Sequence, residues 1–238
     1  MSDKRSSDPM GALAIALVVA AIILSYGLGS AMDRFVQRDR AVEVKGLAER
    51  ELAADLAVWP IGHNVTADTL ASLRERLERA DEAIVAFLKL NGFTGAEITA
   101  NPPSVTDRWM HASPGNRPAE RYMAERTLTL RSGKVDALRQ AMAGAAELLG
   151  QGVALTPNWG NAADFLFTGL EGIKPEMIAE ATADARRAAA QFAEDSGSEV
   201  GAIRRARQGY FTIENLDPSS PHVKRVRVVT TIEYALED

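Results

Sequence analysis

The chain has 238 residues, no cysteine and a formal net charge of −5, with 46% hydrophobic and 25% charged residues. This composition is ordinary for a folded globular chain. The lack of cysteine excludes disulfides, thiolate catalysis and cysteine metal sites, and the acidic balance excludes the broad basic surface that nucleic-acid binding requires. We therefore expect no nucleic-acid partner.

The first feature in chain order is a hydrophobic N-terminal segment. No charged residue occurs between Pro9 and Met32, and the most apolar stretch is ALAIALVVAAIIL, residues 12–24. A helix needs about 20 mostly apolar residues to cross a bilayer, and residues 10–29 supply them. A basic start, an apolar run and small residues before a cut also describe a signal peptide. An uncleaved anchor and a cleaved signal both stay open for residues 1–40.

The charges around this segment do not decide its orientation. Lys4 and Arg5 precede it, and Arg34, Arg38 and Arg40 follow it. Orientation follows lysine and arginine, so this count favours a cytoplasmic domain. A short tail before a signal-like segment favours export instead.

Alternating apolar and charged residues predict the first strand after residue 40. Val42 and Val44 alternate with charged residues, and Gly46 is predicted to interrupt the strand. A second extended stretch covers about residues 52–65. Further strands are expected near Ile98 and near residues 122–130, 165–168, 210–213 and 223–236. In the last of these, one face is predicted to carry Val226, Val228, Thr230, Ile232 and Tyr234.

Three amphipathic helices are predicted between the strands. The first begins at Asp68 as its N-cap and ends near Asn91, the second begins near Val135, and the third has Pro175 in its first turn. Apolar residues at helical spacing form their inner faces. These faces are Leu70, Leu73, Leu77, Ala80, Ile84 and Leu88, then Val135, Leu138, Met142, Ala145 and Leu149, then Met177, Ile178, Ala181, Ala185, Ala188 and Phe192.

Interleaved helices and hairpin-like strand pairs at both ends favour an α+β fold. We expect a mixed, largely antiparallel sheet with about three packed helices and one hydrophobic core over residues 41–238. One N-terminal transmembrane or signal helix precedes it.

No catalytic, cofactor-binding or metal-binding residue is predicted. His63, His111 and His222 lack partners at metal-ligand spacing, and each is interpreted as a surface or turn histidine. Motifs of the GxSxG, HExxH, P-loop and GxGxxG types are missing from the sequence. Adjacent carboxylates such as Glu194 and Asp195 do not face each other on a helix, so they are interpreted as solvated charges.

The most suggestive residues are aromatic. Residues 101–121 form the longest irregular stretch and contain Trp109, Met110 and His111, and Trp159 lies in the segment TPNWGN. Loop tryptophans can anchor a partner or ligand, and they can equally fold back over a core. These four residues are the candidate contacts to a partner or ligand.

Four segments resemble a known family. They are VEVKGLAERELAADLAVWPI, GFTGAEITANPPSV, EMIAEATADARRAAAQFAEDSGSEVGAIRRARQG and VKRVRVVTTIEYALED. They resemble the first strand pair, the turn after the first helix, the alanine-rich helix with its following strand, and the final strand of SIMPL (DUF541) proteins. The resemblance spans about residues 41–238. Residues 104–121 depart from the common pattern as an insertion.

The resemblance implies a cellular location but no chemical reaction. Bacterial members of the family are typically exported or anchored in the envelope, and some are linked to stress defence. The leading hypothesis is a non-enzymatic inner-membrane protein with one membrane-spanning helix and a periplasmic binding or structural-interaction domain, or its cleaved periplasmic form. Its expected partners are the membrane, further copies of itself or another envelope protein. A hydrolase-like envelope enzyme and a membrane-tethered sensor acting through a partner stay open as alternatives.

Overall fold

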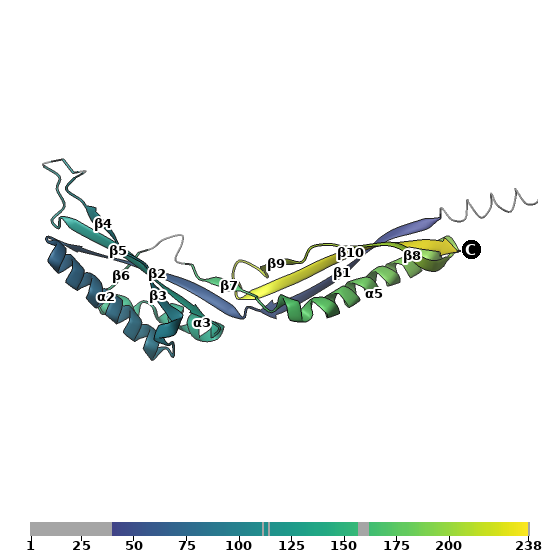
Figure 1. Cartoon of the computed structure of the whole chain (residues 1–238), viewed down its shortest axis with the longest axis horizontal. Helices are drawn as coiled ribbons and strands as arrows, with labels where there is room; N and C mark the ends of the chain where they lie inside the picture. The colour runs from purple at the N-terminus through teal and green to yellow at the C-terminus, as the bar shows by residue number, and fades with distance from the viewer. Residues whose placement is uncertain (1–39, 111, 114, 157–161, 238) are drawn as a thin grey trace, which may run out of the picture. The chain divides into compact units, whose positions relative to one another are not determined.

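A computed structural model describes residues 40–110, 112–113, 115–156 and 162–237 (Figure 1). The predicted N-terminal helix, His111 and Trp159 lie outside these residues. Among the helices that the structure describes, none is long and apolar enough to cross a membrane.

The described chain alternates strands with helices (Figure 1). The strands are β1 (Ala41–Ala53), β2 (Leu56–Ala67), β3 (Ile98–Ala100), β4 (Ser104–Asp107), β5 (Tyr122–Ser132), β6 (Ala154–Leu155), β7 (Asp164–Leu166), β8 (Glu199–Gln208), β9 (Thr212–Asn215) and β10 (Val223–Glu237). The α-helices are α2 (Leu70–Leu90), α3 (Val135–Gly144), α4 (Glu147–Gly150) and α5 (Leu170–Ser196), and η1 (Gly95–Glu97) is a short 3₁₀-helix.

The strands form two sheets. One has the order β1-β10-β8 with β9 also on β10, and the other has the order β3-β5-β2-β6 with β4 on β5 and β7 on β2. Every pair whose register is described is antiparallel. The predicted α+β class is confirmed. The single mixed sheet with about three helices is corrected to two antiparallel sheets with four α-helices in the described residues.

The described residues also divide into two compact units. One comprises residues 40–48, 175–211 and 228–237, and the other comprises residues 49–174 and 212–227. Buried hydrophobic residues form separate clusters within these units. The expectation of one hydrophobic core is therefore wrong. The spacing of apolar residues shows which face of a helix or strand is apolar, but it does not show which of these faces pack into the same core.

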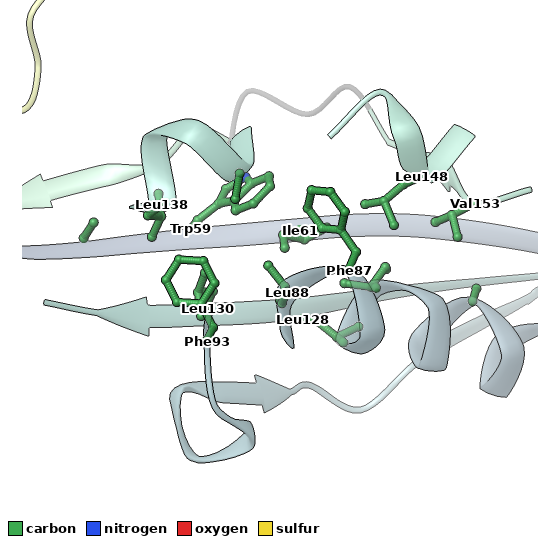
Figure 2. Close-up of a cluster of buried hydrophobic side chains, with 14 of the residues drawn as sticks. Trp59, Ile61, Phe87, Leu88, Phe93, Leu128, Leu130, Leu138, Leu148 and Val153 are labelled. Atoms are coloured by element: carbon green, nitrogen blue, oxygen red, sulfur yellow. The ribbon is translucent and has the colours of Figure 1, made fainter. Parts of the chain in front are cut away.

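The largest core lies in the second unit, where α2 packs on the central strands β2 and β5 (Figure 2). Trp59 and Ile61 of β2 stand directly opposite Leu130 and Leu128 of β5, so all four side chains share one face of the sheet. Ile84 of α2 is fully buried in the same cluster. The predicted burial of Leu73, Leu77, Ala80, Ile84, Leu88 and Leu138 is confirmed.

Several helix details differ from the prediction. Thr69, not Asp68, is the N-cap of α2, and its hydroxyl accepts the backbone N–H of Ser72 at 3.2 Å. Leu70, in the first turn, is exposed. The second helix breaks into α3 and α4, and this break turns Leu148 inward in place of the predicted Leu149.

In the first unit, α5 packs closely on its sheet through small residues. Its buried stripe repeats every four residues as Met177, Ala181, Ala185, Ala189 and Ala193. The predicted Ala188 and Phe192 are exposed, because a step of three residues turns a helical position about 60° away from that stripe. The helix also begins at Leu170, so Pro175 lies inside it rather than in the first turn, and one backbone hydrogen bond is lost.

Gly46 of β1 allows α5 to pack closely against the sheet. A Cβ atom at this position would lie 1.9 Å from the carbonyl oxygen of Ala181 and 2.4 Å from the backbone nitrogen of Ala185. The glycine does not interrupt β1, as the sequence suggested, but gives room for the α5 backbone. On β10, the predicted buried face with Val226, Ile232 and Tyr234 is confirmed.

Candidate functional site

The stretch predicted to be irregular contains a hairpin. β4 pairs with the start of β5, from Ser104 opposite Glu125 to Asp107 opposite Tyr122. Residues 108–121 are therefore the connection of a β-hairpin, and the prediction of a wholly irregular segment is corrected. With four residues, β4 is too short to produce a distinct alternating pattern.

Trp109 is held at the start of this connection by the hairpin itself. Its indole Nε1 donates to the carbonyl of Pro118 at 3.1 Å, and its backbone N–H donates to Asp107 at 3.0 Å. The guanidinium carbons of Arg117 and Arg121 lie 5.1 and 5.4 Å from the centre of the ring. These distances correspond to cation–π contacts, which fix the ring in place.

Two carboxylates fasten the base of the hairpin. Asp107 accepts two hydrogen bonds from Arg121, at 2.7 and 3.0 Å, and this pairing raises the pKa of Arg121. Glu120 accepts the Thr66 hydroxyl and the Arg76 guanidinium, the latter at 2.7 Å. Both bonds stabilise its ionised form and lower the pKa of Glu120. The hairpin is thereby tied to β2 and α2.

The apolar side chain of Met110, the next residue, is open to solvent. Met110 is 77% exposed directly after the partly buried Trp109. Of the four candidate residues, the structure thus describes Trp109 and Met110, which are neighbours in the sequence. His111 and Trp159 lie outside the described residues. Contact of these residues with a partner or ligand stays a prediction.

A buried polar cluster was missed at the sequence level. His63 is fully buried, its Nε2 lies 3.0 Å from Oδ1 of Asp81, and the other oxygen of Asp81 accepts Arg126. Burial is the largest effect and lowers the pKa of His63, while Asp81 opposes this and Arg126 adds to it. The prediction of a surface histidine was wrong.

Alternation along β2 was the signal that could have located this histidine. His63 has the same parity as the buried Trp59 and Ile61, so it points to the same face of the sheet. His222, by contrast, does lie in a turn, where its partly buried ring meets Phe165 edge-on at 6.2 Å between ring centres. Within the described residues, no group of three or more His, Asp or Glu side chains is arranged to hold a metal ion.

The described residues of the second unit line hollows of different size and polarity. The larger, of about 460 Å³, follows the edge of β2 beneath α2, and its walls are Asn64, Val65, Thr66, Arg76, Arg79, Ala80 and residues 151–154. The smaller, of about 230 Å³, is polar, and its walls are His63, Asn101, Pro102, Ser104, Glu125, Arg126, Thr127 and Thr156. Sequence reasoning found neither, because each joins segments that are far apart in the chain.

A comparison with known protein families gives a match over most of the described residues. The family SIMPL, described as a protein of unknown function (DUF541), matches residues 42–231. No curated protein matches the chain. The match covers all the described helices and most of both sheets, ending within β10, and it overlaps all four resembling segments. The chain therefore belongs to the SIMPL (DUF541) family.

Proposed function

We propose that this protein is a non-enzymatic component of the bacterial cell envelope whose SIMPL region binds or structurally organises a partner. The observation that carries the proposal is the braced β4–β5 hairpin. It places the guanidinium groups of Arg117 and Arg121 in cation–π contact with Trp109 and leaves Met110 exposed to solvent. Tryptophan and arginine dominate the energetics of many protein interfaces, and loops set on a rigid sheet commonly carry recognition.

The proposed location is the inner membrane, with residues 10–29 as a single span and the rest of the chain in the periplasm. Cleavage after this segment would give a periplasmic form instead. The uncharged segment and the envelope association of bacterial family members support this location. The proposed partners are the membrane, further copies of the chain or another envelope protein.

A fluorescent fusion tests this location. A reporter that fluoresces only in the cytoplasm, fused after Asp238, is expected to stay dark because the N-terminal segment carries it across the membrane. The same fusion without residues 1–40 should fluoresce. Fluorescence from the full-length fusion would place the domain in the cytoplasm, as the count of flanking arginines favours.

Replacing Trp109 with alanine tests the binding role. Partner proteins cross-linked to the full-length chain in envelope extracts should fall about tenfold, as for loss of an aromatic interface anchor. The midpoint of thermal unfolding should change little, because the described contacts of Trp109 come from its own hairpin.

The control for this variant is Tyr210→Ala, which removes an exposed aromatic side chain from another connection. It should leave capture unchanged. Equal capture by a stably folded Trp109→Ala protein would contradict the proposal. Loss of capture together with a large drop in the unfolding midpoint would assign Trp109 to packing.

A further inference from the structure

The larger hollow follows a part of β2 that has a strand on one side only. β2 pairs with β5 from Ala57 to Ala67, but on its other side it pairs with β6 only at His63 and Asn64. From Val65 onward, therefore, no described strand covers that side. The hollow of about 460 Å³ occupies this place, between α2 and the turn at residues 151–154.

The backbone at this open edge is oriented for hydrogen bonding. The carbonyl of Thr66 accepts the guanidinium of Arg76 at 2.7 Å. An arginine thus occupies a position where the backbone N–H of an added strand would bind. Edge groups that no strand pairs are a template for an extended chain, and strand addition is a recurring mode of peptide recognition. Here the group is held by a side chain, which an incoming peptide N–H can replace.

The charges of the wall indicate which kind of peptide the groove can bind. Arg76 is already neutralised by Glu120, with the two atoms 2.7 Å apart. Arg79 makes one hydrogen bond of 3.3 Å, to the backbone carbonyl of Glu75, and no carboxylate of the described residues forms an ion pair with it. One guanidinium in the wall is thus available to a carboxylate, which is the partner that arginine binds best.

We propose that this groove binds an extended acidic peptide, which adds as a strand along residues 65–67 and places a carboxylate on Arg79. A peptide N–H takes the place of Arg76 on the Thr66 carbonyl, while Glu120 continues to hold Arg76. Asn64 and Gln151 supply amide groups along the walls. The site shares Thr66 and Arg76 with the support of the hairpin, but it includes neither Trp109 nor Met110. Peptide binding by an Arg79 variant and partner capture by a Trp109 variant therefore test the two proposals separately.

Fluorescence anisotropy with the full-length chain in detergent tests this site. The probe is a fluorescein-labelled pentapeptide of alternating threonine and valine that ends in glutamate with a free carboxylate. Its matched control ends in glutamine amide. The acidic peptide should bind about tenfold more tightly, and this preference should weaken as the salt concentration rises.

Variants of α2 locate the binding. Arg79→Gln should weaken the acidic peptide about tenfold, and Arg79→Lys should restore part of the loss because the charge returns. Arg74→Gln is the control, because Arg74 is an exposed arginine of the same helix that pairs with Glu78 and is not in the wall. Circular dichroism of each variant checks that α2 is intact.

Three outcomes would overturn the proposal. The first is equal binding of the acidic and the amide peptide, and the second is unchanged binding by Arg79→Gln. The third is competition by free glutarate at the same concentration as the peptide, which would show a small-carboxylate site without strand addition. Selective binding that depends on Arg79 and is insensitive to glutarate supports it.

Discussion

Replacing Gly46 with alanine is expected to destabilise the protein by about 3 kcal/mol, a large effect for one methyl group. The added carbon would lie 1.9 Å from the Ala181 carbonyl oxygen and 2.4 Å from the Ala185 backbone nitrogen. Both obstacles are backbone atoms, so a rotamer change cannot relieve the clash. α5 must move away from β1, and its contacts along the alanine stripe weaken together.

Denaturant unfolding of the full-length chain measures this effect. The matched control is Gly172→Ala in α5, where an added Cβ atom meets nothing within 4 Å. That change should be neutral or stabilising by up to about 1 kcal/mol, because alanine favours the helix. A Gly46→Ala protein as stable as the unchanged chain would show that α5 does not pack on β1 at this distance.

Ile84→Ala should cost about 3 to 4 kcal/mol, as expected for truncation of a fully buried aliphatic side chain. Ile84 is completely buried in the cluster that α2 forms with β2 and β5. Truncation leaves a cavity between the helix and the sheet that close-packed neighbours fill only in part. Chemical denaturation followed by far-ultraviolet circular dichroism reports the loss.

Phe192→Ala is the control for this core variant. Its side chain was predicted to lie in the core, yet it is 53% exposed on α5. The expected cost is below about 1 kcal/mol, because a surface truncation creates no cavity. A loss as large as that of Ile84→Ala would mean that the exposed face of α5 is covered in the protein under the assay conditions.

The candidate residues show which features of the site a sequence can indicate and which it cannot. Trp109 and Met110 were selected because an aromatic residue lies in the longest predicted irregular stretch, and their contact with a partner stays a prediction. Their support by Thr66 and Arg76 through Glu120 joins residues more than 40 positions apart. No local pattern contains such a connection, and the same holds for the groove that brings Arg79 to the edge of β2.

The amino-acid sequence by itself determined the α+β class, the family and the apolar faces of α2 and β10, since helical and strand periodicity are local properties of the chain. Ile84 and Ala185 were found on the correct faces for this reason. Only the tertiary structure decided the two separate sheets, the pairing of His63 with Asp81 and the contact of Gly46 with α5. These depend on which segments meet across long sequence separations, and packing between distant segments leaves no periodic trace in either one.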